Sequence, residues 1–377
     1  MQVMRIGVDS REIQNGVITG IGRSLANFIE YFRKNEKKHQ LILFSEKKIP
    51  YDLDGNVKQV SIDRSLTIVW DQLRLPQALK SFKIDLFFSP YYKVPLLTDT
   101  SVVNQILDLM FLEFLPYRKA IGLLGRFYYR LFGKVFAKKS ISIITDSEHA
   151  KQDIIKNWNI DHNKIKVIPL GLGNRYRPVN NLDLLNKVRN HFKLPDKFIL
   201  YLGNFKPHKN VSFLVKVFKE LENKFLDYKL VLAGPIDEHG EKIKNLVSEI
   251  GLQERVVFTD TIRESDFPEA LISLAEIFVF PSLYEGFGLP PLEAMACGTP
   301  VVASNLTSIP EVVGDAGLLI NPFNLKSMSN AIADLIEHSD KRELFRKKGL
   351  ERAKRFNEND TAGKLFEHII SLMEKIE

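Results

Sequence analysis

Short apolar runs alternate with longer amphipathic segments along most of the chain. The runs cover residues 4–9, 39–45, 85–90, 101–107 and 140–147 in the first half, and 197–204, 228–235, 255–260, 276–282 and 299–304 in the second. Between them, segments such as 211–225 and 240–252 repeat apolar residues at helical spacing. Apolar strands that alternate with helices are typical of parallel sheets covered on both faces. The pattern predicts an α/β protein.

The chain is long enough for two such domains. Its 377 residues suit two units that each bury a core. The stretch KVIPLGLGNRYRPVNN, from Lys166, has the proline and glycine content of a linker. We therefore expect doubly wound, Rossmann-like domains over 1–172 and 173–355, and a C-terminal helix over 356–377 that can cross back to the first domain. Such sheets bind ligands at the carboxyl ends of their strands, so we expect the site in a central cleft that the two domains face.

Composition narrows the cellular setting. The single cysteine, Cys297, excludes an internal disulfide and a cysteine-based zinc site, which fits a reducing cytosol. The first residues lack the layout of a signal peptide, and no uncharged apolar stretch approaches the roughly 20 residues that span a bilayer. We expect a cytoplasmic protein. The net charge of +7 predicts an anionic binding partner, namely nucleic acid, a phosphate-bearing substrate or acidic lipid.

A glycine-rich turn follows the first strand. In GVITGIGRSLANFIEYF, the residues Gly16, Gly20 and Gly22 are expected to precede a helix. Glycines let the backbone approach a ligand, and a helix N-terminus offers N–H groups to an anion. The turn is equally consistent with a purely structural connection.

A second glycine turn, in LYLGNFKPHKNVSFLV, is basic. Gly203 follows a strand, Lys206, His208 and Lys209 follow in the loop, and a helix is expected from about Val211. A lysine beside a helix N-terminus suits a diphosphate, because it adds a point charge to the backbone donors. The alternative is a solvated lysine on a polar turn.

Two glutamates flank a glycine-proline turn in LYEGFGLPPLEAMACG. We expect a helix that begins at Pro290 or Pro291 and places Glu293 in its first turn, with Glu285 on the loop before it. Glu293 can act as a helix cap or can pair its two oxygens with the two hydroxyls of a ribose. Glu285 either faces a ligand or is a solvated loop residue. The turn would also expose the N–H groups of residues 287–289.

Taken together and in this order, these loops closely resemble the E-x₇-E pattern of the retaining GT-B glycosyltransferases, glycosyltransferase family 4 or "glycosyl transferases group 1". Within this family the chain looks nearest to bacterial mannosyl- and rhamnosyltransferase-like members. The resemblance also covers ITDSEHAKQDI with VIPLGLG, and SIPEVVGDAGLLINPFN. It implies transfer of a hexose, mannose-like or 6-deoxy, from a GDP-, UDP- or dTDP-linked sugar to a glycan or lipid-linked acceptor. It implies retention of configuration, and neither a metal nor another cofactor.

The same resemblance implies roles for individual residues. Glu285 would contact the donor sugar, Lys209 would bind the diphosphate as it leaves, and Asp108 would complete the catalytic set. Glu293 would hold the ribose, and Phe258 would lie where the base is seated. The remaining donor-binding positions would be Gly20, Gly22, Gly203, Asn204, Lys206, Phe287, Gly288 and Leu289.

Two features of the sequence depart from the family pattern. Leu107 stands where a histidine usually precedes the aspartate at 108, and the phosphate loop has Asn204, Lys206 and His208 where an arginine is usual. These changes leave the identity of the donor sugar open. A leucine near the outer hydroxyls would suit a 6-deoxy sugar such as rhamnose.

The segment 117–139 contains seven basic residues and no acid, interleaved with leucines and aromatics. Helices of this kind can lie on anionic bilayers, which would make the protein peripheral on the inner face of the membrane. The alternative is a core helix with a basic outer face.

Two other classes stay open. A sugar-nucleotide epimerase of the same architecture would use the donor and need no acceptor. A basic nucleic-acid-binding protein would bind with steep salt dependence. The basic residues lie in phosphate-type loops and one helix, not along a stripe, so we expect no nucleic-acid partner.

Overall fold

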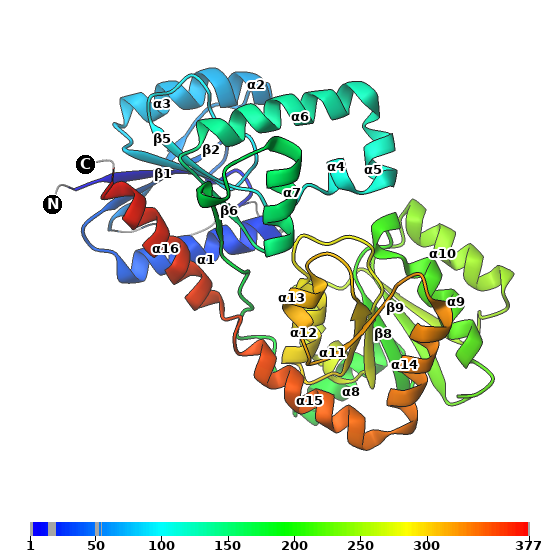
Figure 1. Ribbon diagram of the computed structural model, residues 1–377. Coiled ribbons are helices and arrows are strands. Elements are labelled where there is room, and N and C mark those ends of the chain that lie inside the picture. The colour runs from blue at the N-terminus through cyan, green and yellow to red at the C-terminus, as the bar shows by residue number, and fades with distance from the viewer. Residues whose placement is uncertain (1–2, 14–19, 50–52, 54, 376–377) are drawn as a thin grey trace. The chain divides into compact units, whose positions relative to one another are not determined.

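The computed structural model describes residues 3–13, 20–49, 53 and 55–375. The chain forms two compact units: unit 1 comprises residues 1–171 and 358–377, and unit 2 comprises residues 172–357. Each unit is a parallel sheet with helices on both faces (Figure 1). This confirms the predicted α/β class with two doubly wound sheets. No helix in the described ranges is long and apolar enough to cross a membrane.

Unit 1 has a seven-stranded sheet in the order β3-β2-β1-β4-β5-β6-β7. The strands are β1 (Arg5–Asp9), β2 (Gln40–Ser45), β3 (Val57–Ser61), β4 (Leu86–Ser89), β5 (Ser101–Gln105), β6 (Ser142–Thr145) and β7 (Ile165–Val167). The helices are α1 (Gly20–Asn35), α2 (Thr67–Val69), the π-helix η1 (Trp70–Arg74), α3 (Leu75–Ser81), α4 (Met110–Glu113), α5 (Leu115–Ala120), α6 (Gly122–Lys139), α7 (Glu148–Trp158), the 3₁₀ turn η2 (His162–Lys164) and α16 (Glu358–Met373).

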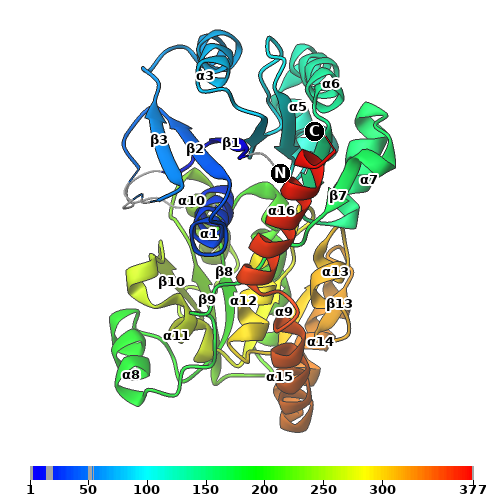
Figure 2. The same cartoon turned by 90° about the vertical axis from the view of Figure 1, so that its left-hand side faces the viewer.

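The two faces of this sheet bury different cores. On one face, α1 and α16 pack over β1, β2 and β4, and Phe28 and Phe32 of α1 meet Leu365 and Ile369 of α16 in one apolar cluster. Figure 2 shows α1 and α16 lying close together. On the other face, η1, α3 and α6 cover the sheet through Trp70, Leu79 and Phe136. The helix expected at 356–377 therefore belongs to the core of unit 1.

Unit 2 has a six-stranded sheet in the order β10-β9-β8-β11-β12-β13. The strands are β8 (Lys197–Leu202), β9 (Tyr228–Ala233), β10 (Val256–Asp260), β11 (Ile277–Phe280), β12 (Val301–Ser304) and β13 (Leu318–Ile320). The helices are α8 (Leu182–His191), the 3₁₀ turn η3 (Pro207–Lys209), α9 (Val211–Leu221), α10 (Glu238–Glu249), the 3₁₀ turn η4 (Glu264–Asp266), α11 (Pro268–Ser273), α12 (Leu289–Ala296), α13 (Ile309–Val313), α14 (Leu325–Glu337) and α15 (Ser339–Ala353).

In both sheets the order in which successive strands are added reverses at one place. In unit 1 the order turns between β1 and β4, and in unit 2 it turns between β8 and β11. At such a switch point the loops that follow the two strands run apart, and the crevice between them is where open α/β sheets bind ligands. The fold therefore marks one candidate position in each unit.

Three strands escaped the sequence analysis: β3, β7 and β13. Each lies at an edge of its sheet and is partly exposed along its length, so it lacks a continuous apolar run. The stretch expected as a linker from Lys166 also begins within β7. The segment 117–139 belongs to two helices rather than one, because the helix breaks at Ile121 and Gly122, the first residue of α6, has a φ of +67°.

Candidate functional site

The switch point of unit 2 brings two of the expected residues into contact. The loop after β8 ends in η3, and the loop after β11 carries Glu285. Lys209 Nζ lies 2.6 Å from Glu285 Oε1, and both side chains are 11% exposed. The Lys209 ammonium also lies 5.0 Å from the ring centroid of Phe280. The two partners are 76 positions apart in the sequence, and the pairing of β8 with β11 brings their loops together.

The carboxylate of Glu285 is held by more than this lysine. Ser282 Oγ, fully buried, lies 2.5 Å from Glu285 Oε1, the same oxygen that Lys209 contacts. The backbone N–H of Glu285 donates to Thr307 Oγ1 at 3.1 Å. Among the described residues, Glu285 Oε2 has no hydrogen-bond partner. One oxygen therefore fixes the side chain while the other stays available to a ligand.

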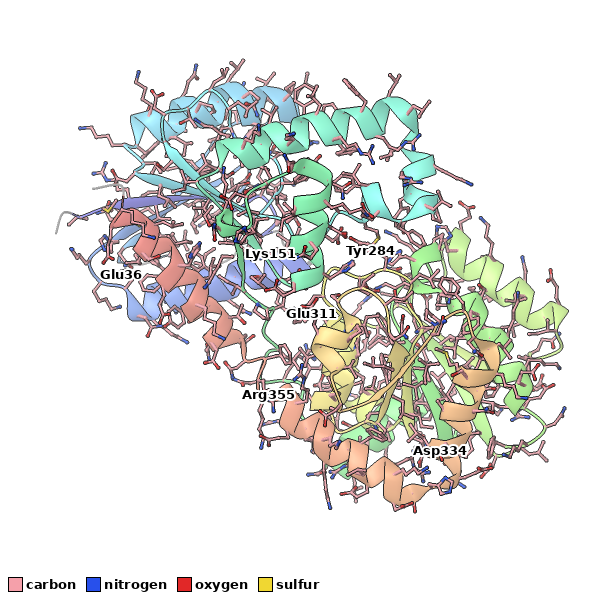
Figure 3. All side chains as sticks on the ribbon, viewed as in Figure 1. Glu36, Lys151, Tyr284, Glu311, Asp334 and Arg355 are labelled. Carbon is pink, nitrogen blue, oxygen red and sulfur yellow. The ribbon has the colours of Figure 1, made fainter. Side chains whose placement is uncertain are left out.

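A third hydroxyl shapes the loop itself. Ser308, before α13, donates to the carbonyl oxygens of Glu285 at 3.0 Å and Phe287 at 2.7 Å. Tyr284 on the same loop, labelled in Figure 3, is 5% exposed. The roles of Ser282, Thr307 and Ser308 were not predicted, because nothing in the local spacing of these residues indicates their contacts with the loop of Glu285.

The loop ends at the N-terminus of α12. Gly288, with a φ of +119°, precedes the first helical residue, Leu289, so the helix begins one residue before the expected Pro290. Among the described residues, the N–H groups of Phe287, Gly288 and Leu289 have no acceptor. The ring of Phe287 packs on Phe356 at 5.8 Å between centroids. The turn thus presents backbone donors next to Glu285 at the positive end of a helix.

Glu293 lies deeper in α12 than expected. It is the fifth residue of the helix, not a member of its first turn, which has no acid. This corrects the predicted position and removes the geometry of an N-terminal cap. Its side chain is buried, with 8% of the residue exposed. Burial raises the pKa of the Cys297 thiol, and the nearby charge of Glu293 raises it further.

The loop after β8 is braced by hydrogen bonds and by the stacking of Tyr201 on Phe205. Tyr201 donates to Asn204 O at 2.6 Å, and Asn204 Oδ1 accepts from the N–H of Lys206 at 3.2 Å. Gly203 starts the loop, its N–H bonded to Ala233 O at 2.9 Å. Lys206 is exposed, so its ammonium is in water.

Two further side chains border this loop. Phe258, half-buried on β10, meets Phe205 edge-on at 6.4 Å. His208 is buried, which lowers its pKa to about 3, with a further contribution from Lys209. At neutral pH its imidazole is therefore uncharged.

The expected unit 1 residues lie in ordinary structural settings. Gly20 and Gly22 do not precede α1 but form its first turn, which corrects the predicted boundary, while Gly16 lies outside the described residues. Asp108 Oδ1 accepts from the N–H of Met110 at 2.9 Å at the start of α4. Leu107 beside it is half-buried.

A charged cluster that sequence analysis missed occupies the switch point of unit 1. Arg11, after β1, makes a bidentate pair with Asp9 at 2.6–3.2 Å and reaches Asp71 of η1 at 2.8 Å. Its guanidinium lies 3.7 Å from the ring centroid of Trp70. Burial alone would lower the pKa of Arg11, but the contacts with the two aspartates outweigh it and raise the pKa.

This cluster lines a cavity of about 660 Å³. The wall includes Ser10, Glu12, Lys47 and Tyr91 besides Arg11. Within the described ranges, no group of three or more histidine, cysteine or acidic side chains is placed to hold a metal ion.

Comparison with known proteins gives a family match within unit 2 and weaker similarity over longer stretches of the chain. Residues 185–352 match the profile of the family described as Glycosyl transferases group 1. The O-antigen chain mannosyltransferase B of Escherichia coli is 34% identical over 216 residues, which cover 57% of this chain and 56% of that protein. The O-antigen chain mannosyltransferase RfbU of Salmonella typhimurium is 28% identical over 66% of this chain and 64% of its own length. The matched regions thus span little more than half of these relatives.

Solved structures match over nearly the whole chain. Sucrose-phosphate synthase from Thermosynechococcus elongatus superposes with a TM-score of 0.75 at 20% identity, covering 98% of this chain and all of the other. HepE from Anabaena, in complex with UDP and glucose, gives a TM-score of 0.75 at 16% identity with the same coverage. At these identities the likeness concerns the fold, which is the GT-B fold.

Proposed function

We propose that the chain is a retaining hexosyltransferase, because residues 185–352 match the profile of the glycosyl transferases group 1 family. It takes a mannose-like or 6-deoxy hexose from a nucleotide-diphosphate sugar and transfers it to a hydroxyl of a glycan or lipid-linked acceptor. The relatives named as O-antigen mannosyltransferases favour a mannosyl donor and a role in polysaccharide synthesis. Unit 2 binds the donor, and unit 1 the acceptor.

One observation carries this proposal: Lys209 and Glu285 meet at the switch point of unit 2, beside the backbone donors that precede α12. Glycosyl transfer builds positive charge on the sugar and negative charge on the departing diphosphate. Glu285 Oε2 serves the first need, and the ammonium serves the second, since only one of its three N–H donors is used by Glu285. The N–H groups of residues 287–289 add to the second without a metal.

The other donor contacts are carried over from the family resemblance. Glu293 binds the ribose hydroxyls, Phe258 borders the base, and the loop over Gly203, Asn204 and Lys206 approaches the phosphates. In unit 1, Gly20, Gly22 and Asp108 are the residues that the family resemblance assigns to donor binding and catalysis. Replacing Glu293 by Gln should weaken nucleotide-diphosphate binding by about 1.5–3 kcal/mol, because charge-assisted hydrogen bonds become neutral ones. Unchanged affinity with lower stability would assign Glu293 to packing alone.

We place the protein on the inner face of the membrane as a peripheral enzyme, in contact with anionic lipid through residues 117–139. A lipid-linked acceptor would then be presented at the same surface. The seven basic residues of this segment support the placement.

The deciding experiment is a thermal-shift screen against GDP-, UDP- and dTDP-sugars, followed by turnover with and without acceptor. A bound donor raises the melting temperature by mass action. Turnover should require the acceptor and should survive EDTA. Donor conversion without acceptor would favour an epimerase, and rescue of an EDTA-treated sample by magnesium or manganese would contradict the metal-free mechanism.

A further inference from the structure

Helix α6 exposes large apolar side chains on its outer face. Leu123, Leu124 and Phe127 are 76%, 86% and 68% exposed, and Tyr128, Leu131, Phe132 and Val135 follow at 38–45%. A helix on the surface of a soluble protein normally turns such residues inward and shows polar ones to water. We define the outer face of α6 by these seven residues. Figure 1 shows α6 running along the outside of unit 1.

The inner face of α6 is already committed to the core. Phe136 and Ala137 belong to the apolar clusters beneath it. Gly133 packs against the indole of Trp158, so closely that an added Cβ would lie 2.2 Å from the ring. The helix therefore cannot rotate to bury its outer face without opening this contact. Something outside unit 1 must cover the outer face if it is to leave water.

A row of positive charge runs beside the apolar one. Arg126, Arg130 and Lys134 recur every fourth residue, and so do Leu123, Phe127, Leu131 and Val135, so the two rows lie next to each other on the helix. A groove of about 500 Å³ is lined by members of both rows and by Asn157 of α7. Cations next to exposed leucines and aromatics match the boundary between anionic headgroups and acyl chains.

Charge favours an anionic bilayer over other partners for the outer face of α6. With seven basic residues and no acid over 117–139, a second copy of the chain would bring like charges together. A nucleic acid would pair with the basic row but would leave the leucines in water. An anionic bilayer satisfies both rows at once.

We infer that the outer face of α6 docks on an anionic bilayer surface, with Leu123, Leu124 and Phe127 entering the acyl boundary and Arg126, Arg130 and Lys134 binding headgroup phosphates. This deepens the proposed membrane placement by naming the residues that insert and those that pair. It does not depend on the proposed reaction, since vesicle binding is measured without sugar nucleotide.

The first test is sedimentation with vesicles of phosphatidylglycerol or of phosphatidylcholine. We expect binding to the first, weakened by salt, and none to the second. Changing Arg126, Arg130 and Lys134 to Glu should reduce binding on the order of a hundredfold or more, because each basic residue near the surface contributes roughly 1 kcal/mol. The matched control changes Lys58, Lys216 and Lys326 to Glu, three exposed lysines elsewhere, and should retain binding.

The second test reports insertion. Both tryptophans, Trp70 and Trp158, are fully buried, so Phe127→Trp adds the one exposed indole to the chain. Its emission should shift to the blue on addition of phosphatidylglycerol vesicles. Leu123→Gln with Leu124→Gln should weaken binding without any change of charge, and a purely coulombic contact would be indifferent to that pair.

The outcomes are distinct. Equal binding to both lipids, loss of binding by the control triple variant, or an unshifted emission would overturn the inference. Donor affinity, followed by thermal shift, should be unchanged in the Arg126, Arg130 and Lys134 triple variant. If that variant loses donor binding and vesicle binding together, the helix supports the fold of the enzyme and not the membrane contact.

Discussion

The two units share one topology but use their switch points in opposite ways. In unit 1, Arg11 is held by Asp9 and Asp71 and lies flat on Trp70, so its charge is satisfied from several sides. In unit 2, Lys209 meets a single carboxylate, and that carboxylate keeps one oxygen without a partner among the described residues. The first arrangement is complete without a ligand, and the second is not.

The difference shows that position in a fold does not decide what a charge does. An arginine with two buried carboxylates and a stacked ring has little to gain from a further anion, so it holds η1 to the sheet. A lysine that uses only one of its three N–H donors among the described residues, near a helix N-terminus, gains a great deal from a diphosphate. We therefore expect stability to depend most on Arg11 and turnover to depend most on Lys209.

The largest effect should follow Arg11→Met. This substitution leaves Asp9 and Asp71 buried without their cation, and breaking a buried pair in this way costs about 3–5 kcal/mol. The free energy of unfolding, from chemical denaturation, should fall by that amount while donor affinity stays unchanged. A weaker donor affinity at full stability would show that Arg11 acts on the ligand and would erase the contrast.

Lys209→Met should lower kcat by about 10²–10³, the usual loss when one preorganised donor to developing charge is removed. It will also lower stability, since Glu285 is left buried with no cation. The control is the double variant with Glu285→Gln, which leaves no unpaired charge. It should recover stability and not turnover. Recovery of turnover in the double variant would mean that the pair is structural.

Ser282→Ala tests how Glu285 is positioned. Removing the hydroxyl deprives Oε1 of one charge-assisted hydrogen bond, which is worth about 1.5–3 kcal/mol. We expect kcat to fall more than the affinity for free nucleotide diphosphate, because we propose that Glu285 acts on the sugar. Ser282→Thr keeps the hydroxyl and should retain most of the activity. An equal loss in Ser282→Thr and Ser282→Ala would point to packing.

The smallest effect concerns pH. The folded pKa of His208, about 3, lies below its ordinary value of 6.5, so the unfolded chain binds more protons between these limits. Its contribution to stability is therefore complete above pH 6.5 and is lost as the pH falls toward 3, with a slope of at most about 1.4 kcal/mol per pH unit. His208→Asn should flatten the stability profile in this window relative to wild type. An unchanged slope would show that other groups set the acid sensitivity.

Most of the fold could be predicted because a buried strand has a continuous run of apolar residues in the sequence. The ten apolar runs all became strands, and only the half-exposed edge strands β3, β7 and β13 were missed. The ends of the helices were predicted less accurately. Gly20 and Gly22 read as turn residues, yet they lie in the first turn of α1, where the helix tolerates them.

The candidate site also has a part that could be predicted from the sequence and a part that could not. Lys209 and Glu285 could be predicted as candidate site residues because each lies in a loop that follows a strand at the carboxyl edge of one parallel sheet, whereas their ion pair was not predicted. The cluster of Arg11 with Asp71 could not, since 60 residues and an irregular π-helix separate the partners. The contacts of the hydroxyls around Glu285 could not be predicted for the same reason, because they are set by tertiary packing and not by spacing along the chain.

Helix α16 has a consequence for biosynthesis. Its residues Leu365, Ile369 and Met373 fill the core of unit 1 against α1, yet the ribosome makes them only after all of unit 2. Unit 2 is contiguous and can close while it emerges, whereas unit 1 must wait with an open apolar surface along α1 for nearly two hundred residues. During that interval the nascent chain exposes a surface that chaperones bind. The segment translated first is thus the one that matures last.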